Sequence, residues 1–365
     1  MGLVKFLRVK FRRKRHSADD EISAAAAVAV DTTTTNCKHD DRTQRIVKRL
    51  SWDQIQRLIT IDSSPIIGYG GFSTVYLAGR FQDFSTTTAA AAVKIQNCTS
   101  HRFRQAYKME LEILLRLHHR YIVKLIAYCD HPEEGALVLE YASNGNLQQR
   151  LHSSNTSLAW RRRVAIAFQL AQAICYLHDG CSPHIVHGDV KSSNVLLDEN
   201  LDCKLCDFGS AKVGFSSAID PPPPAADSNA RRPWRSNRTA VVGSPGYTDP
   251  AYLRTGLASK KNDVYGFGVV VLELITGVEA FSAARGERLT ARAEPMLRDA
   301  GKVAEMVDPR LAGGEIDLEE ARAMAAMAAK CLSDSPGVRP SKFNLSIKLL
   351  LQSFNNNNIL IFSDR

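Results

Sequence analysis

The sequence predicts an α+β fold in which a strand-rich part precedes a larger helical part. The first part contains a strand, a glycine turn and a strand over residues 66–78, then strand-like segments at 91–95 and 137–141. The second part contains a helix-periodic stretch at 158–178 and a strongly apolar one at 261–277 that ends on a glycine. Strands grouped ahead of helices are typical of the α+β class, because α/β folds alternate the two.

Composition indicates an intracellular globular protein. Of 47 basic residues, seven lie in residues 1–16, which contain no acid, so 40 remain against 38 acidic residues. This balance gives no reason to expect nucleic-acid binding. The eight cysteines show no disulfide-like spacing, and no apolar run approaches the ~20 residues of a membrane span. We therefore expect a cytoplasmic protein.

Residues 1–45 are predicted to form a disordered basic tail. Lys and Arg are interleaved with Leu, Val and Phe over residues 5–15, which favours contact with the anionic inner face of the plasma membrane. A nuclear address at 12–15 and a solvated arm are the alternatives. Myristoylation of Gly2 is not expected, because its motif has Ser or Thr where this chain has Phe6.

The ordered part is predicted to begin near Ile46. Ser51 can cap a helix over residues 52–58, whose apolar residues follow helical spacing. The glycine turn within 66–78 has small residues that let backbone N–H groups approach phosphate oxygens. No helix follows it directly, which argues against a dinucleotide-binding turn. The next helix is predicted over 103–118.

One short loop carries the residues best suited to chemistry. It holds Asp189, Lys191 and Asn194, and Asp207 opens an Asp-Phe-Gly sequence thirteen residues after Asn194. Phosphoryl transfer requires one carboxylate at the attacking hydroxyl, and an amide oxygen and a second carboxylate on magnesium. A loop held between rigid elements can direct such groups into one cleft.

Residues 213–240 are predicted to form a disordered or extended insertion. Four consecutive prolines at 221–224 cannot lie in a helix or a central strand. Ser236 and Thr239 lie near an arginine cluster, so they are candidate phosphorylation sites, or equally unmodified loop residues.

Together these segments resemble a eukaryotic-type protein kinase over about residues 60–341. The loop at 187–194 resembles the His-Arg-Asp-x-x-x-x-Asn catalytic loop, and the strand that contains Lys94 resembles Val-Ala-Ile-Lys. The segments 118–125 and 263–268 are similar to those of plant receptor-like kinases. Without an ectodomain or a membrane span, the chain is most similar to the receptor-like cytoplasmic kinases.

The resemblance implies a two-lobed protein-kinase fold. A small β-rich N-lobe with one main helix is expected at about 60–140, and a larger, mostly helical C-lobe at about 143–341. The whole kinase domain is expected to span 46–341, and an atypical tail is expected at 342–365.

The implied reaction transfers the γ-phosphate of ATP to Ser or Thr hydroxyls of a protein substrate, with Mg²⁺ as cofactor and an upstream receptor kinase as a partner. Asp189 would accept the hydroxyl proton, and Lys191 would neutralise charge on the phosphoryl group. Asn194 and Asp207 would bind Mg²⁺. Asp263 is expected to cap its helix and to bond the backbone of the catalytic loop.

Nucleotide contacts are implied for the glycine loop, the strand lysine and the linker between the lobes. Glu110 is expected to pair with Lys94. Glu112 lies about 200° further round the helix, so only one of the two glutamates can face the cleft. Leu139 would limit the back of the pocket. The expected nucleotide-site residues are Gly68, Tyr69, Gly70, Gly71, Phe72, Ser73, Val75, Ala92, Lys94, Glu110, Glu140, Ala142, Leu196 and Asp207.

The chain departs from the family pattern in three places. Gly188 stands where many kinases have the Arg that binds an activation-segment phosphate, which predicts a non-RD kinase. Ala251 replaces the Glu of Ala-Pro-Glu, so we expect the buried Arg339 to lack its partner and to weaken the C-lobe by ~3–5 kcal/mol. The stretch from Lys342 differs from the usual last helix.

The competing hypothesis is a pseudokinase scaffold that docks partners without catalysis. The altered Ser73, Ala251 and tail favour it, whereas the retained acids and lysines of the site favour an enzyme. Ser244 is expected, by analogy with the family, to support the substrate-binding loop.

Overall fold

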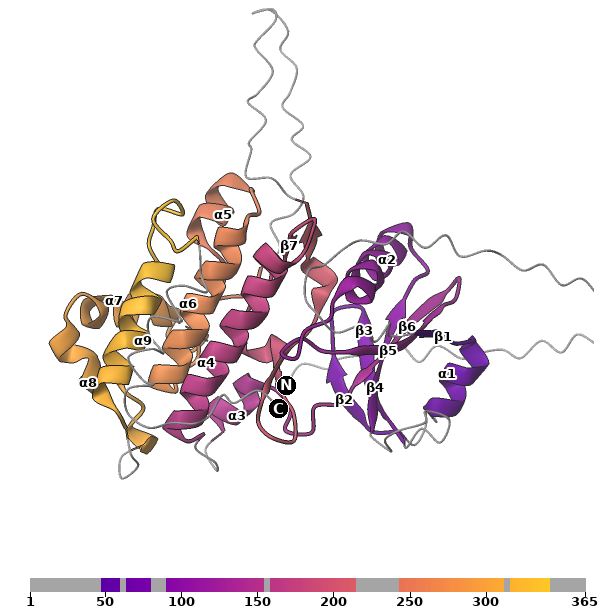
Figure 1. The fold of residues 1–365 in the computed structure, drawn as a ribbon, viewed down its shortest axis with the longest axis horizontal. Coiled ribbons are helices and arrows are strands. Elements are labelled where there is room, and N and C mark those ends of the chain that lie inside the picture. Colours follow the sequence, from indigo (N-terminus) through magenta and orange to yellow (C-terminus); the bar gives the residue numbers. More distant parts are fainter. Residues whose placement is uncertain are drawn as a thin grey trace, which may run out of the picture. The chain divides into compact units, whose positions relative to one another are not determined.

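The computed structural model describes residues 47–59, 64–79, 90–153, 158–214, 243–311 and 316–341. The predictions for the tail at 1–45, for nearly all of the insertion with Ser236 and Thr239, and for the stretch from Lys342 lie outside the described residues. Within them, a sheet precedes a helical part, as predicted (Figure 1).

The sheet has six strands in the order β1-β5-β6-β4-β3-β2. All neighbours are antiparallel except the parallel pair β1 and β5. The strands are β1 (Lys48–Arg49), β2 (Ile66–Tyr69), β3 (Ser73–Ala78), β4 (Ala91–Asn97), β5 (Leu125–Asp130) and β6 (Glu134–Glu140). The central strands β4 and β6 are mostly buried, since helix α2 covers one face (Figure 1).

Two helices accompany the sheet. Helix α1 (Trp52–Leu58) has the predicted bounds, because the Ser51 side chain and Gln54 form a reciprocal capping box. Helix α2 (His101–Arg116) begins two residues before the predicted start, where Ser100 provides the cap. Tyr107 anchors α2 to the sheet, since its hydroxyl donates to the Cys129 carbonyl at 2.7 Å.

The helical part is organised around α6 (Lys260–Thr276), which is apolar all round and almost wholly buried. Helices α4 (Trp160–Cys175) and α9 (Leu318–Cys331) pack against it (Figure 1). Its Gly266 is required, because a Cβ there would lie 2.6 Å from the Val190 carbonyl oxygen. The helix core and the catalytic loop therefore meet backbone to backbone.

Smaller elements complete this part. They are α3 (Leu147–His152), β7 (Ile185–Val186), β8 (Val195–Leu197), β9 (Cys203–Leu205), β10 (Lys212–Val213), α5 (Pro250–Thr255), β11 (Phe281–Ser282), β12 (Glu287–Arg288), α7 (Leu289–Leu297) and α8 (Val303–Met306). No described helix is long and apolar enough to cross a bilayer.

Two sequence predictions need correction here. The helix predicted over 158–178 is α4 followed by a π-helical turn at Tyr176–Gly180. Asp263 does not cap α6: Ser259 is the N-cap, and its side chain accepts the Lys261 N–H. Asp263 lies in the first turn, where its carboxylate is free to bond elsewhere.

Candidate active site

The backbone of the catalytic loop is held by α6. Asp263 accepts the N–H groups of His187 and Gly188, both at 2.8 Å, and lies 2.7 Å from Nε2 of His178. The expected bond between Asp263 and the loop is therefore present. Because Asp263 and its helix are buried, the loop takes its position from the core of the C-lobe.

Gly188 adopts a conformation that suits glycine. Its φ is +80°, and a Cβ at this position would lie 2.7 Å from the carbonyl oxygen of Ser210. A side chain here would need both a left-handed backbone and displacement of the turn after Asp207. The position is thus built for glycine rather than merely lacking an arginine.

Three polar side chains meet at the centre of the loop. The Asp189 carboxylate lies 2.6 Å from Nζ of Lys191 and accepts the Ser244 hydroxyl at 2.8 Å. Lys191 also donates to Ser244 at 2.8 Å. The sequence places Ser244 only in the substrate-binding loop, and no local pattern indicates its contact with an acid 55 residues away.

A second set of charges is formed by Lys94 and two carboxylates from different segments. The Lys94 Nζ lies 2.7 Å from Glu110 on α2 and 2.9 Å from Asp207 after β9. Burial alone would lower the pKa of Lys94, but the charges of Glu110 and Asp207 raise it. Burial likewise opposes ionisation of Asp207, yet Lys94 lowers its pKa, so both groups are charged. Glu112 instead pairs with Arg116 on the surface.

Asn194 and Asp207 fit a magnesium ion by the chemistry of their donors. The Asn194 amide nitrogen donates to the Asp189 carbonyl at 2.9 Å, which leaves the amide oxygen to serve as a ligand. Asp207 is half-exposed on its side chain and ionised. Amide and carboxylate oxygens are the ligand types that Mg²⁺ takes in proteins.

The glycine loop joins β2 to β3. The Gly70 N–H donates to the Ser73 carbonyl at 2.8 Å and closes the turn. Val75 pairs with Lys94 across β3 and β4, so the loop lies next to the lysine in register. Phe72 contacts Phe103 of α2 with ring centroids 4.1 Å apart. The remaining expected loop residues, Gly68, Tyr69 and Gly71, lie in the same turn and its flanking strand.

The linker follows β6 and faces β8. Ala92 is buried in β4 opposite Leu139, and Leu196 of β8 bridges to Asn146 beyond the linker. The Glu140 carboxylate accepts the Lys124 N–H at 2.8 Å and also lies 3.2 Å from Lys204. Its side chain is thus committed within the protein, and its backbone N–H donates to the Lys124 carbonyl at 2.9 Å.

The prediction that Arg339 lacks a partner is wrong. Its guanidinium makes two bonds to Asp249, Nη1 to Oδ2 at 2.6 Å and Nη2 to Oδ1 at 2.9 Å. It also donates to the carbonyls of Ser333 and Lys261. Asp249, two residues before Ala251, takes the place expected of the missing Glu. The motif position indicated residue 251 as the partner, whereas the Arg339 guanidinium lies within hydrogen-bond distance of Asp249.

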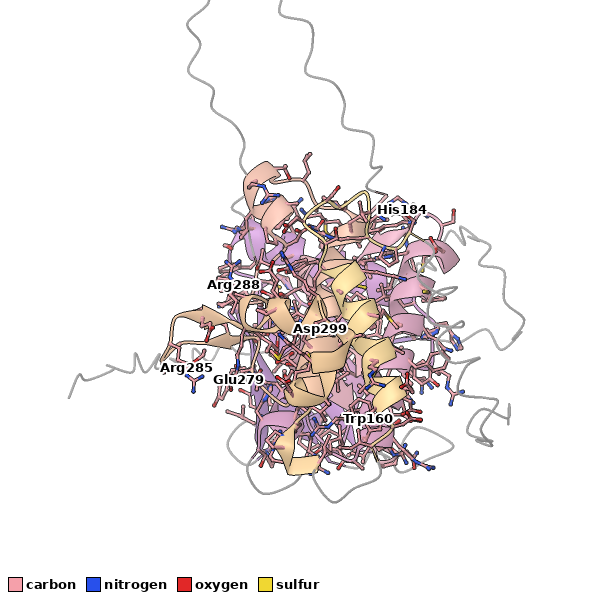
Figure 2. The ribbon with its side chains drawn as sticks, turned by 90° about the vertical axis from the view of Figure 1, so that its left-hand side faces the viewer. Trp160, His184, Glu279, Arg285, Arg288 and Asp299 are labelled. Atoms are coloured by element: carbon pink, nitrogen blue, oxygen red, sulfur yellow. The ribbon has the colours of Figure 1, made fainter. Side chains whose placement is uncertain are left out.

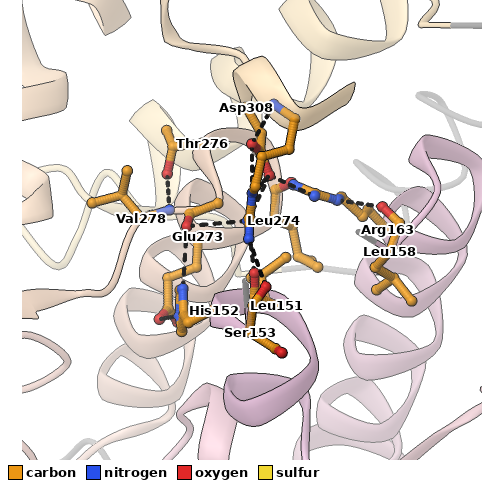
Figure 3. A network of polar contacts seen from close by, with 12 residues as sticks. Leu151, His152, Ser153, Leu158, Arg163, Glu273, Leu274, Thr276, Val278 and Asp308 are labelled. Atoms are coloured by element: carbon orange, nitrogen blue, oxygen red, sulfur yellow. Dashed lines mark hydrogen bonds and ion pairs between the residues drawn. The ribbon is translucent and has the colours of Figure 1, made fainter. Parts of the chain in front are cut away.

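A buried carboxylate, Glu273 of α6, links the loop to the C-lobe interior. It accepts from the Tyr247 hydroxyl at 2.7 Å and from Ser192 at 3.3 Å, and lies 3.0 Å from Nε2 of His152. Nearby, Asp308 bonds Arg163 and Arg310, which in turn reach backbone carbonyls of α3, α6 and their loops (Figure 3). Through Ser192, Glu273 connects the catalytic loop to the buried polar groups of the C-lobe.

A cavity of about 400 Å³ lies outside the nucleotide site, around β11, β12 and the start of α7. Glu279, Arg285 and Arg288 are among its lining residues and project from this region (Figure 2). A Cβ on Gly246 would lie 2.7 Å from the Ala280 carbonyl, so the loop that carries Ser244 packs against the segment between Glu279 and Ser282.

Known proteins match the chain over most of its length. Residues 61–352 match the protein kinase domain. The chain is 51% identical over 311 residues to the probable receptor-like protein kinase At4g10390 of Arabidopsis thaliana, covering 82% of this chain and 86% of that protein. It is 50% identical over 300 residues to salt tolerance receptor-like cytoplasmic kinase 1 of Oryza sativa subsp. japonica, covering 80% and 77%.

A more distant relative is also named as a receptor-like kinase. The chain is 36% identical over 298 residues to the probable LRR receptor-like serine/threonine-protein kinase At5g16900 of Arabidopsis thaliana, which covers 80% of this chain and 32% of that protein. These matches agree with the fold. The chain belongs to the protein kinase domain family, and it is a serine/threonine protein kinase of the plant receptor-like group.

Proposed function

We propose that this kinase transfers the γ-phosphate of ATP to protein hydroxyls through the two charge clusters described above. The carrying observation is that Asp189, Lys191 and Ser244 meet at the catalytic loop, while Lys94, Glu110 and Asp207 form a second charge cluster. Asp189 accepts the proton of the attacking hydroxyl. Lys191 lies close enough to that carboxylate to neutralise charge that develops beside it.

Nucleotide positioning is assigned to Lys94 and the glycine loop, with Glu110 holding the lysine. Asn194 and Asp207 would hold magnesium, which when bound neutralises phosphate charge. The residues themselves bind and orient, because phosphoryl transfer needs little covalent help from the protein.

The kinase is further proposed to be of the non-RD type. Gly188 supports this, since its φ of +80° and the nearby Ser210 carbonyl disfavour any side chain there. Asp263 supplies an alternative hold on the catalytic loop through the N–H groups of His187 and Gly188. Phosphate capture by residue 188 is therefore not needed to position the loop.

The partners and the location of the kinase are proposed from its relatives and from its composition. A receptor kinase acting upstream and a protein substrate are the expected partners, and the basic residues 5–15 favour an anionic membrane surface at ~1 kcal/mol per cation. Binding of the full chain to vesicles with and without phosphatidylserine tests the last point. Equal binding to both would favour the nuclear-address or solvated-arm alternative.

Autophosphorylation with Mg-ATP tests the assignment of the site. Lys94→Met and Asp207→Asn should each reduce phosphate incorporation to background, whereas the matched surface variants Lys330→Met and Asp334→Asn should retain it. Wild-type incorporation no higher than that of the site variants would reject the enzyme assignment in favour of the scaffold.

A further inference from the structure

Glu110 has a second buried partner besides Lys94. Gln96 lies two residues after Lys94 on β4, so both side chains project from the same face of the strand. The Gln96 amide nitrogen donates to Oε2 of Glu110 at 2.5 Å, while Lys94 contacts Oε1 at 2.7 Å. Gln96 is 9% exposed and Glu110 2% exposed. The two oxygens of one buried carboxylate are thus divided between two neighbours on one strand.

We propose that Gln96 is a positioning residue that keeps Glu110, and with it α2, in the catalytic arrangement while Lys94 engages the nucleotide. The inference rests on the proposed role of Lys94 in ATP binding. It assigns to Gln96 a task that the lysine–glutamate pair cannot perform alone.

The division of labour follows from competition for the lysine. Lys94 already shares its ammonium between Glu110 and Asp207, and nucleotide phosphates would compete for the same three donors. A buried carboxylate that loses a donor becomes unfavourable. The Gln96 amide is neutral, so anionic phosphates do not draw it away in the same manner.

The position of this bond along α2 matters. Two other anchors of the helix, Tyr107 to β5 and Phe103 to the glycine loop, lie towards its N-terminal half, and buried apolar side chains pack its later turns on the core. Oε2 of Glu110 would lie 3.8 Å from a Cβ on Gly209, beside the turn that begins with Asp207. Gln96 therefore adds a polar hold on the part of α2 that faces the proposed metal ligand.

Substitutions at residue 96 separate a donor requirement from simple packing. Gln96→Leu keeps the approximate volume but removes the donor, and should raise the KM for ATP and lower kcat/KM about tenfold, the loss typical of a bond to a charged group. Gln96→His keeps a neutral N–H donor and should retain most of the activity. Gln96→Glu places a second carboxylate against Glu110, and its activity relative to wild type should rise from pH 8 to pH 6 as the pair takes up a proton.

Gln169→Leu provides the matched control. Gln169 of α4 is also a buried glutamine, hydrogen-bonded to Asp202, to the Cys203 N–H and to Tyr121, and none of these partners is an expected nucleotide-site residue. Its substitution should lower the melting temperature without changing the KM for ATP. The Kd of a fluorescent ATP analogue, measured without turnover, should increase for Gln96→Leu and stay unchanged for Gln169→Leu.

The outcomes discriminate clearly. If Gln96→Leu lowers the melting temperature as Gln169→Leu does but leaves KM, kcat/KM and the Kd unchanged, Gln96 is only structural and the inference fails. If Gln96→His is as impaired as Gln96→Leu, a neutral donor at residue 96 is not what holds Glu110, and the inference fails. An inactive wild type that still binds nucleotide more tightly than Gln96→Leu would reject the proposed function while supporting the role of Gln96.

Discussion

Removing the partner of Arg339 tests how the end of the activation segment is anchored. Asp249→Ala deletes both bonds to the guanidinium and leaves a charge whose side chain is fully buried. It also deletes the cap of α5, since Asp249 accepts the Ala251 N–H at 2.8 Å, and a bond from Asn262. The loss should therefore exceed that of a surface ion pair.

The magnitude follows from these contacts. Breaking one side of a buried ion pair typically costs ~3–5 kcal/mol, and a lost cap adds about 1 kcal/mol. The contacts that Arg339 keeps with the carbonyls of Ser333 and Lys261 offset part of this, so we expect about 3–5 kcal/mol in total. For a domain of nearly 300 residues the unfolding entropy is about 0.6 kcal/mol/K, which corresponds to a decrease of about 5–8 °C in Tm.

Thermal and urea denaturation of four proteins form the assay: wild type, Asp249→Ala, Ala251→Glu and the double variant. Ala251→Glu alone should not stabilise the protein, because Arg339 is already paired. In the Asp249→Ala background Ala251→Glu should restore part of the lost stability, because it offers Arg339 a carboxylate two residues along the chain. An equal gain in both backgrounds, or no destabilisation by Asp249→Ala, would refute the assignment of Asp249 as the partner.

Three further predictions concern the loop, the hydroxyl beside it and a buried imidazole. Gly188→Arg should lower both kcat and Tm, with strain of about 1–3 kcal/mol, and gain of a phosphate-dependent activity would contradict this. Ser244→Ala should reduce kcat about tenfold through loss of its bond to Asp189, whereas Ser244→Thr should retain activity. Burial, assisted by the charge of Arg120, lowers the pKa of His119 from 6.5 to about 4. Between pH 6.5 and 4 the imidazole is protonated in the unfolded chain but not in the folded protein. The free energy of unfolding is therefore highest above pH 6.5 and decreases as the pH falls towards 4, by about 1.4 kcal/mol per pH unit. His119→Phe should flatten urea-denaturation stability across that window, and an unchanged slope would contradict it.

Local patterns predicted the elements and the principal residues of the site. The helix at Trp52–Leu58 was placed correctly because its cap and its apolar spacing lie within a few residues of one another. Lys94, Asp189 and Asp207 are predicted as site residues in the same way, since each belongs to a short motif with fixed spacing. Helix geometry predicts that only one of Glu110 and Glu112 can face the cleft, and the structure pairs Glu110 with Lys94.

Contacts between distant segments could not be predicted in this way. Asp249 and Arg339 are 90 residues apart, and Ser244 and Asp189 are 55 apart. Which acceptor a buried donor reaches depends on the packing of helices that spacing does not define. Gly188 is a related case. The sequence shows only that the usual arginine is missing there, whereas the structure shows a φ of +80° and the Ser210 carbonyl oxygen 2.7 Å from where a Cβ would lie.

The carboxylate of Glu273 makes the substrate loop and α3 energetically interdependent. Tyr247, Ser192 and His152 all share its two oxygens, so removing any one of them changes the donors left to the other two. Residues within one such network typically show interaction energies of 0.5–3 kcal/mol in double-mutant cycles. A substitution at His152, outside the reacting groups, should thus alter the measured effect of a substitution at Tyr247. Variation at that helix can tune how firmly the substrate loop is held without altering any group that touches the nucleotide.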